Sequence, residues 1–505
     1  MSDDVVDLSA TAPPAQLTTE YCIIGSGPAG ATAARLLAER GRDVVLLEEG
    51  GDFTGRALTQ RDGAMYDQLY MDRGGRTTED MSIAVLQGRA LGGGAVINAS
   101  DVVPIPPAVL EHWSRRFGIP GLSEAELAPH ARAALEDLRA NPIREDQLNL
   151  ANRLLREGAQ KLGLRGEVMD HNRQGCIGLG TCLIGCPMNA KQSPRLVAIP
   201  AALAAGARVF VRARVERVTG AQREDKTVVC RALDAKGYHA GARFELRAKT
   251  VIVAASAVGS AHLLLQSGIG NPHVGRNLML QPQLPITAIF EREVDAFRGI
   301  PQAYAVTEHE TADAERGLWG FRIEAIMGTP GIVSTLLPWI GAEGKARMSR
   351  YRHIAASLLL VPDEPSGEIR RGPGGRPIVR YTQRDNHRAR LREAIKVATR
   401  IYLAAGAREV VVPCHPPLLL RSEADLSSAD ALDFAPATVP LLSAHQQGTV
   451  RFSTSRSQGG ADPDGQVWGT KRVYVFDSSG YPSSASSHTM APIITTARAL
   501  TARLS

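Results

Sequence analysis

The sequence lacks several features that would place a chain of 505 residues in other protein classes. No apolar run reaches the roughly eighteen residues that a membrane-spanning helix needs, so no membrane span is expected. The chain has no run of lysine and arginine and no nucleic-acid-binding motif, and its formal charge of +6 is small for this length. Nucleic acid is therefore not an expected partner. Aromatic residues make up only 5%, which argues against an extensive aromatic platform for stacking sugars.

The first residues of the chain also lack an apolar segment. Residues 1–19 contain early aspartates and two prolines, a composition that predicts a flexible tail and not a signal peptide. The expected location is therefore cytoplasmic. Stable disulfides are rare in that compartment, where cysteine clusters more often bind metal or take part in redox chemistry.

Cysteine is scarce, but half of it is concentrated in one place. Of six cysteines, Cys176, Cys182 and Cys186 lie within eleven residues of a glycine-rich loop, residues 172–193. Thiolates spaced as C-x5-C-x3-C are suitable iron ligands, and three of them suit a cuboidal cluster that lacks one iron. Two other interpretations stay open, namely a structural loop with free thiols and a zinc or disulfide site.

Glycine is abundant, and its most informative cluster lies in residues 20–50. A short apolar strand ends at Gly25, helical spacing follows Gly30, and a second buried strand precedes the acidic Glu48. In a dinucleotide-binding turn of this kind, Gly25 permits the tight turn, and Gly27 lets the backbone approach a pyrophosphate. Gly30 lets the helix pack closely on the strand. Glu48 is placed to accept hydrogen bonds from an adenosine ribose. The segment predicts dinucleotide binding, and it leaves FAD and NAD as alternatives.

A second glycine cluster, QGRALGGGAVINAS at 87–100, decides between them by resemblance. It is similar to the GRxLGGSSxIN signature of the glucose-methanol-choline (GMC) oxidoreductases, although Gly94 stands where the family usually has serine. In the family this loop runs along the FAD pyrophosphate and isoalloxazine. The matching residues are Gly88, Arg89, Gly92, Gly93 and Asn98.

Further matches follow in the family's order along nearly the whole chain. RVERV resembles the strand that places a valine, here Val215, against the adenine, and residues 249–270 resemble VILAAGAIxSPxLLLxSGIG. VGRNLMLQP has Gln281 where histidine is common. The resemblance implies an α/β fold, with a Rossmann-like FAD-binding domain assembled from discontinuous segments. A substrate domain of antiparallel sheet plus helices accompanies it.

The resemblance also implies a division of the chain. After the tail at 1–19, residues 20–283 form the FAD-binding domain, which contains the cysteine-rich loop. Residues 284–440 form the substrate-binding domain, and residues 441–505 return to the FAD domain. An acidic segment, EADLSSADALDF at 423–434, is expected to be a surface loop unless it lines the cavity, where it would meet an amino-sugar substrate.

The C-terminal strip carries the expected catalytic residues. His445 begins HQQGT, whose histidine lies beside the flavin N5 in the family, and His488 occupies the position of the second His or Asn. Asp477 matches an aspartate that helps to hold FAD. A histidine is suited to take the hydroxyl proton while a hydride leaves the same carbon. We therefore expect His445 to act as the base and His488 to orient the substrate oxygen.

The resemblance implies oxidation of a hydroxyl group to a carbonyl by hydride transfer to flavin N5. The His–His pair favours a sugar, glycoside or polyol, including an amino-sugar primary alcohol of the kind oxidised in aminoglycoside biosynthesis. One alternative is a flavin alcohol oxidase that uses oxygen on sterol, long-chain or aryl alcohols. An alternative of another class is a flavoprotein amine oxidase or disulfide reductase.

The cysteine spacing has its own counterpart in the family. It resembles the [3Fe-4S] site of bacterial FAD glucose dehydrogenases and the cysteine-rich loop of cholesterol-oxidase-like members. A cluster there would pass electrons singly to an electron-acceptor protein, which makes the enzyme a dehydrogenase. Without a cluster, direct reaction with oxygen makes it an oxidase.

Overall fold

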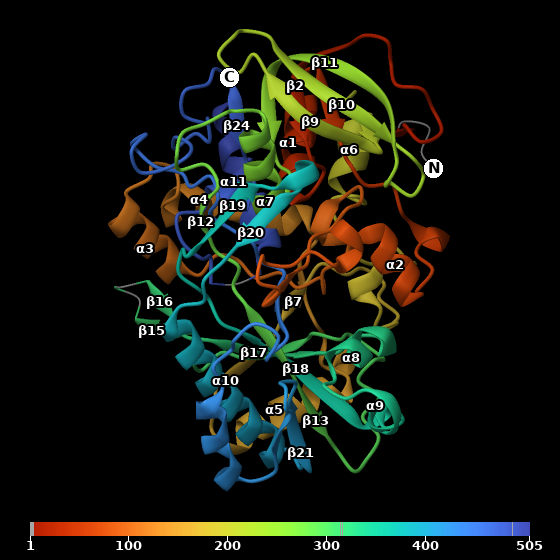
Figure 1. The fold of residues 1–505 in the computed structure, drawn as a ribbon, viewed down its shortest axis with the longest axis vertical. Helices are drawn as coiled ribbons and strands as arrows, with labels where there is room; N and C mark the ends of the chain where they lie inside the picture. Colours follow the sequence, from red (N-terminus) through yellow and green to blue (C-terminus); the bar gives the residue numbers. More distant parts are fainter. Residues whose placement is uncertain (1–4, 314, 316, 487, 505) are drawn as a thin grey trace.

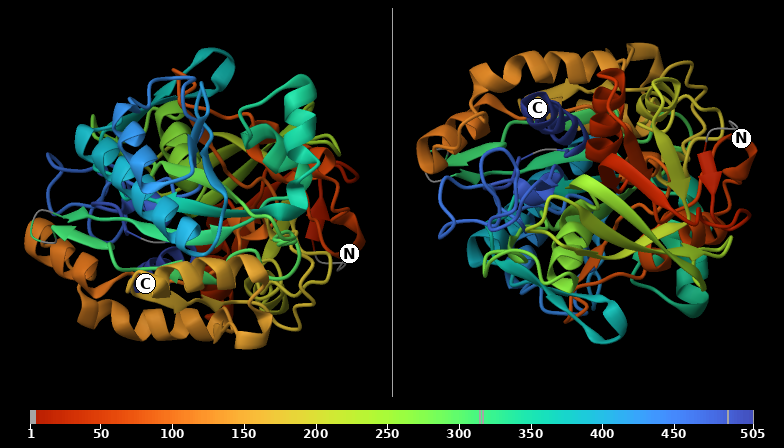
Figure 2. Two further views of the ribbon diagram at one scale, coloured as in Figure 1. Left: turned by 90° about the horizontal axis from the view of Figure 1, so that it is seen from below. Right: turned by 90° about the horizontal axis from the view of Figure 1, so that it is seen from above.

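Two large sheets, with helices packed on them, organise the chain (Figure 1). The structure is a computed structural model, and it describes residues 5–313, 315, 317–486 and 488–504. Figure 2 shows that the first and last parts of the chain lie side by side in the same half of the molecule. Among the described helices, none is long and apolar enough to cross a bilayer.

The first sheet has eight strands in the described part of the chain, in the order β1-β8-β3-β2-β11-β10-β9, with β24 beside β11. Its β2–β3 core consists of consecutive buried apolar residues, as expected for parallel strands that are covered on both faces. The β9–β10–β11 part is antiparallel. The strands are β1 (Val5–Asp7), β2 (Leu17–Ile24), β3 (Val44–Leu47), β8 (Arg208–Val211), β9 (Ala213–Thr219), β10 (Lys226–Leu233), β11 (Ala240–Val253) and β24 (Val473–Val475).

The expected flexible tail at 1–19 is wrong for part of that segment. Val5 to Asp7 pair in parallel with β8, and β2 already begins at Leu17. The physical reason is apolar burial, since Leu8 and Leu17 are each only 5% exposed and both belong to the core.

The second sheet has nine described strands in the order β22-β21-β13-β18-β17-β14-β6, with β23 pairing with both β13 and β4. Most of it comes from residues 284–440, as expected, but β4, β6 and β23 are recruited from outside that range. The strands are β4 (Ile83–Val85), β6 (Gly166–Val168), β13 (Gln283–Ile289), β14 (Tyr304–Val306), β17 (Arg322–Ile326), β18 (Ile354–Leu360), β21 (Glu409–Val412), β22 (Leu418–Leu420) and β23 (Leu441–Ser443).

Helices pack on each sheet. On the first sheet, α1 packs against β2 and β3 and is flanked by α6 and α11, and α7 packs against β9. The second sheet is covered by α5 and α10, which also contact each other (Figure 1). The helices are α1 (Pro28–Glu39), α2 (Asp62–Leu69), α3 (Pro107–Phe117), α4 (Glu124–Asp137), α5 (Leu150–Lys161), α6 (Ala198–Ala204), α7 (Ser256–Gln266), α8 (Pro330–Leu336), α9 (Gly341–Met348), α10 (Asp385–Ala404) and α11 (Met490–Arg503).

Smaller sheets complete the described part. The segment PIVR at 377–380 contributes a strand to one of these and not to the second large sheet. They are formed by β12 (Arg276–Leu278), β19 (Gly367–Arg371) and β20 (Pro377–Arg380), by β5 (Asn141–Pro142) and β7 (Asp170–His171), and by β15 (Thr311–Asp313) and β16 (Leu318–Trp319).

The contact between α5 and α10 allows a test of the packing. A Cβ on Gly158 would lie 2.0 Å from the carbonyl oxygen of Ile401, so Gly158→Ala must push the two helices apart. We expect destabilisation of about 1–3 kcal/mol from overpacking, measured by urea unfolding. Gly63→Ala in α2 is the matched control, because a Cβ there meets nothing within 4 Å. It should be neutral or stabilising by up to about 1 kcal/mol. Equal effects of the two changes would contradict the packing.

Candidate functional site

One large cavity, of about 1190 Å³, is lined by residues of both large sheets. From the first sheet come Ile24 and Val215, and from the second come Gln283, Ile326 and Leu358. Ligand pockets commonly measure about 300–1,000 Å³, so this space suits a dinucleotide together with a small substrate.

Two glycine loops form one wall of the cavity by direct backbone contact. Gly25 has φ +96°, and a Cβ there would lie 2.4 Å from the carbonyl oxygen of Ala254. A Cβ on Gly93 would lie 2.6 Å from the Cα of Gly27. Gly27 is also the N-cap of α1, so the helix N-terminus opens into the cavity between the two loops. Backbone N–H groups placed in this way fit a pyrophosphate.

Gly30 and Glu48 support this glycine turn. A Cβ on Gly30 would lie 1.9 Å from the carbonyl oxygen of Gly25, so only glycine lets α1 pack there. The Glu48 carboxylate lines the cavity and accepts hydrogen bonds from the Ser26 N (3.0 Å), the Ser26 Oγ (2.6 Å) and the Gly50 N (2.8 Å). Burial raises the pKa of Glu48, and these hydrogen bonds oppose that rise. Glu48 therefore braces the turn as well as facing the cavity.

The signature loop contributes to the wall in different ways. Gly88 and Asn98 line the cavity, whereas Gly92, in the left-handed region at φ +102°, supports the turn before Gly93. Arg89 also lines the cavity, and its guanidinium donates to the carbonyls of residues 236 and 237 in the β10–β11 hairpin, each at 3.0 Å. Asn98 is held by its Nδ2, which lies 3.2 Å from the Met490 Sδ.

Asp477 lies at the other side of the glycine wall. It caps the short helix η9 (Ser478–Gly480), where its carboxylate accepts from the Ser479 N at 2.9 Å and from the Ser260 Oγ at 2.5 Å. Burial raises the pKa of Asp477, and the hydroxyl groups of Ser260 and Ser479 lower it. The carboxylate is thus fixed in the cavity wall.

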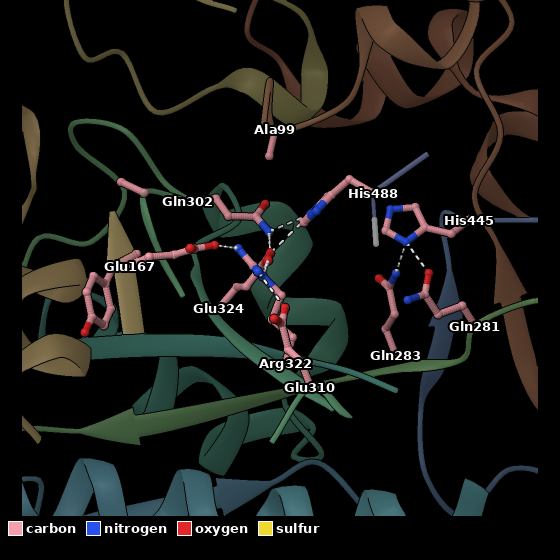
Figure 3. A network of polar contacts seen from close by, with 12 residues as sticks. Ala99, Glu167, Gln281, Gln283, Gln302, Glu310, Arg322, Glu324, His445 and His488 are labelled. Atoms are coloured by element: carbon pink, nitrogen blue, oxygen red, sulfur yellow. Dashed lines mark hydrogen bonds and ion pairs between the residues drawn. The ribbon is translucent and has the colours of Figure 1, made fainter. Parts of the chain in front are cut away.

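The two expected catalytic histidines meet at the end of the cavity beside the second sheet (Figure 3). His445 follows β23, and His488 lies just before α11. Their ring centroids are 5.2 Å apart and the planes are inclined by 70°. Segments that are far apart in the sequence therefore bring both imidazoles to one place.

His445 is held as a neutral imidazole. It is 8% exposed, and burial lowers its pKa to about 3, with the His488 charge acting in the same direction. Its Nδ1 lies 2.7 Å from the Gln281 Oε1 and 3.0 Å from the Gln283 Nε2. In the tautomer that matches the shorter contact, Nδ1 donates its hydrogen to Gln281, and Nε2 is then the basic nitrogen.

His488 is held in the opposite protonation state. Burial by itself lowers its pKa, but the charge of Glu324 and a hydrogen bond to it raise the pKa above the usual value. The His488 Nε2 lies 3.1 Å from the Glu324 Oε2, which also accepts from Gln302 (Figure 3). Glu324 is fully buried, yet the charges of His488 and Arg322 lower its pKa to about 2. The pair therefore joins a carboxylate to an imidazole whose charged form is favoured.

Arg322 connects this pair to further carboxylates. It donates to Glu324, to Glu310 at 2.6 Å and to Glu167 at 3.0 Å, with only 6% of its side chain exposed (Figure 3). The two carboxylate oxygens of Glu324 therefore have different partners, Arg322 at Oε1 and His488 at Oε2.

No sequence motif marks Arg322 or Glu324 as functional residues. Arg322 and Glu324 alternate with Ile323 and Ala325, and such alternation is more typical of a strand with one exposed face. Asp363 was also missed, although it accepts from the backbone N of Gln281 at 3.0 Å and so positions that side chain.

The cysteine loop lies against the segment that carries Asn98. The Lys191 ammonium donates to the carbonyls of Val96 (2.9 Å), Asn98 (2.6 Å) and Cys182 (2.9 Å). The guanidinium of Arg173 lies 3.8 Å from the Cys182 Sγ, and it also donates to the Ala99 carbonyl. The loop is therefore fastened to the cavity wall by two buried cations.

The predicted metal site is not supported by this geometry. The thiols of Cys176, Cys182 and Cys186 are free and partly buried. Across the described residues, no three His, Cys, Asp or Glu side chains form a group that could hold a metal ion. The residues as placed do not fit a [3Fe-4S] cluster.

The acidic segment at 423–434 does not contribute to the cavity lining. It forms the short helix η8 (Glu423–Ala431), from which Glu423 and Asp430 pair with Arg400 and Lys396 of α10. It is a surface element, as the simpler interpretation held.

Comparisons with known proteins agree with these features. Residues 66–283 and 363–497 match the two models of the GMC oxidoreductase family, and residues 23–85 match an NAD(P)-binding Rossmann-like domain. An uncharacterized GMC-type oxidoreductase of Mycobacterium tuberculosis is 34% identical over 484 residues, which are 95% of this chain and 74% of that protein. A long-chain-alcohol oxidase, FAO3 of Arabidopsis thaliana, is 28% identical over 521 residues, 97% of this chain and 68% of that one.

The fold is also similar to that of solved structures. The crystal structure of pyridoxine 4-oxidase from Mesorbium loti superposes with a TM-score of 0.71 at 20% identity. The match covers 96% of this chain and 99% of that one. At this identity the likeness shows a shared fold.

The opposite protonation states of the two histidines can be measured directly. We expect the ¹³Cε1 resonance of His445 to show no titration between about pH 5 and 8, because burial keeps the ring neutral. In Glu324→Gln the negative charge beside His488 is lost, so its pKa should fall below the usual value of about 6.5. Histidine NMR, assigned with His445→Asn and His488→Asn, checks both. Glu310→Gln is the control, because Glu310 contacts Arg322 and should leave the His488 pKa nearly unchanged. A His488 that titrates alike in native protein and Glu324→Gln would contradict the pairing.

Proposed function

This chain belongs to the GMC oxidoreductase family, and we propose that it is an FAD-dependent enzyme that oxidises a hydroxyl group of a sugar, glycoside or polyol to a carbonyl. The observation that carries the proposal is the pairing of a neutral His445 with a charged His488 at one end of the cavity. The other end of the same cavity is the glycine wall.

The residues present fit FAD. The contact of Gly27 with Gly93 leaves a cradle of backbone that side chains would fill, and it opens at the α1 N-terminus. Glu48 and Val215 line the adenosine end, and Asp477 lies in the wall toward the histidines. When bound, FAD supplies the hydride acceptor of the reaction.

The two histidines have different roles toward the substrate hydroxyl. The lone pair on the Nε2 of His445 is suited to take the hydroxyl proton, because Gln281 holds the hydrogen on Nδ1. As that proton leaves, negative charge develops on the substrate oxygen. The imidazole of His488, whose charged form Glu324 favours, would lie beside that oxygen and stabilise the charge. Glu324 keeps His488 charged throughout.

The lining near the histidines supports a polar substrate. Asp101, Gln283 and Gln302 face the cavity there, together with the apolar Ile326 and Leu358. The Arabidopsis relative is named a long-chain-alcohol oxidase, and a monohydric alkyl alcohol is the second candidate substrate. A long alkyl chain would leave the Asp101 carboxylate, which has no hydrogen-bond partner among the described residues, still unpaired, and this costs free energy. An amine substrate is disfavoured because its positive charge would lie beside His488.

The electron acceptor is a separate part of the proposal. The C-x5-C-x3-C spacing supports an iron–sulfur exit toward an acceptor protein, and the buried cations Arg173 and Lys191 would stabilise thiolates. Against it stands the arrangement of the described thiols, which does not fit a metal. Oxygen as the acceptor is the alternative, and it is supported by the names of the Arabidopsis oxidase and of the solved pyridoxine 4-oxidase.

Loss of the proposed base tests the mechanism. We expect His445→Ala to slow anaerobic reduction of the bound flavin by an alcohol by about 10²–10⁴-fold, because the hydroxyl proton has no acceptor. The flavin content should not change, since the His445 ring is hydrogen-bonded to Gln281 and Gln283 and not, among the described residues, to the glycine backbone that forms the proposed FAD cradle. Stopped-flow absorbance at the flavin band gives the rate. His239→Ala, on an exposed part of the β10–β11 hairpin, is the matched control. Native reduction rates in His445→Ala would refute the proposed base.

Iron and acid-labile sulfide analysis distinguishes the two proposed routes for electrons leaving the flavin, an iron–sulfur cluster and oxygen. If the cysteines hold a cluster, anaerobically purified protein should contain about three irons per chain, and Cys182→Ser should remove them. If oxygen is the acceptor, the protein should contain flavin and no iron, and hydrogen peroxide should form with alcohol. A flavin-only protein that turns over with oxygen would exclude the cluster and leave the alcohol oxidation intact.

A further inference from the structure

Asp101 is a buried acid that no part of the mechanism above uses as a reacting group. Its side chain lines the cavity and is only 3% exposed. Neither carboxylate oxygen has a hydrogen-bond partner in the described part of the chain. Buried carboxyl groups almost always have partners, because removing them from water without compensation is costly. An unpartnered acid that faces a cavity therefore indicates a ligand that supplies the missing donor.

The charges around Asp101 place it at the substrate end of the cavity. Burial raises its pKa to about 7, against the attraction of Arg173 and His488 and with the repulsion of Glu324. His488 belongs to the histidine end of the cavity, whereas Arg173 lies behind the wall at the Ala99 carbonyl. Asp101 lines the same cavity as both histidines, so its carboxyl group can meet a molecule that occupies this space.

A structural ion pair with Arg173 does not explain Asp101. The Arg173 guanidinium is used by the Ala99 carbonyl and by the His171 Nδ1 at 3.0 Å. Its Nε has no hydrogen-bond partner among the described residues, so it makes no bond to Asp101 either. The two side chains attract each other through space, but the oxygens of Asp101 stay available to a third group.

We propose that Asp101 is a specificity-determining residue that accepts a hydrogen bond from a second hydroxyl of the substrate, one or two carbons from the hydroxyl that is oxidised. The inference rests on the proposed alcohol oxidation and deepens it, since it selects diols and polyols over monohydric alcohols. A neutral hydroxyl is the fitting donor. An ammonium group in this position would lie beside the positive charges of His488 and Arg173, which would repel it.

The test uses the FAD-loaded enzyme and two matched substrates, 1,2-hexanediol and 1-hexanol. We expect native enzyme to prefer the diol by about 100-fold or more in kcat/KM, because the monohydric alcohol leaves Asp101 unpaired. Asp101→Leu should remove most of that preference, through a loss with the diol and little change with 1-hexanol. Asp101→Asn keeps an acceptor oxygen without the charge, and it should retain about a tenth of the preference.

Thermal unfolding separates this role from a structural one. Because the buried carboxyl has no partner, Asp101→Asn should leave the Tm of substrate-free enzyme unchanged or raise it. Added 1,2-hexanediol should raise the Tm of native enzyme and not that of Asp101→Leu. Asp170→Asn is the matched control, since that exposed acid lies in the neighbouring strand β7 and should behave as native in both measurements.

The outcomes distinguish this inference from the proposed function. If both variants oxidise the two alcohols with the native ratio, or the native enzyme shows no diol preference, the role of Asp101 is overturned and alcohol oxidation stands. A fall in the Tm of Asp101→Asn with an unchanged preference also overturns it, because the acid is then structural. If native enzyme is reduced by neither alcohol nor by any polyol, both proposals fail.

Discussion

The contact between two glycine backbones, at Gly27 and Gly93, is the constraint on which the rest of this molecule depends. A Cβ on Gly93 would lie 2.6 Å from the Cα of Gly27, so no side chain can separate the two loops. The segments are far apart in the sequence, and each is fixed by its own neighbours. Glu48 braces the first through Ser26 and Gly50, and Lys191 holds the carbonyls on the far side of the second. The glycine wall of the cavity therefore depends on the contacts made by Glu48 and Lys191 as well as on Gly27 and Gly93.

The chemistry depends on giving two identical side chains different protonation states within one small space. Both histidines are buried, which disfavours the charged form of each. A fully buried carboxylate, Glu324, reverses this for His488 alone, because it is itself kept ionised by Arg322. His445 lies on the side of Gln281 and Gln283, which provide hydrogen bonds without charge. Position relative to Glu324 therefore decides which imidazole is the base and which is the cation.

Sequence motifs predicted those parts of the site whose geometry depends on residues close together in the chain. The glycine turns and the HQQGT strip have a fixed spacing, and the wall and the histidine pair lie where that spacing indicates. Glu324, Gln302 and Asp101 have no such spacing, because their roles come from a sheet that joins distant strands. Residues 5–7 were assigned to a tail because polar neighbours hide a short apolar strand. The cysteine spacing implied a metal, but the backbone around it places the thiols differently.

The cysteine loop still matters to the cavity when no metal is considered. Lys191 links Cys182 to Val96 and Asn98, and Arg173 links the sulfur of Cys182 to Ala99. Residues 98 to 101 therefore lie between this loop on one side and the substrate end of the cavity on the other. A change at Cys182, such as oxidation or metal binding, would alter the charge that faces both cations. Because the same short segment places both Asn98 and Asp101 in the cavity lining, such a change would be felt by both side chains.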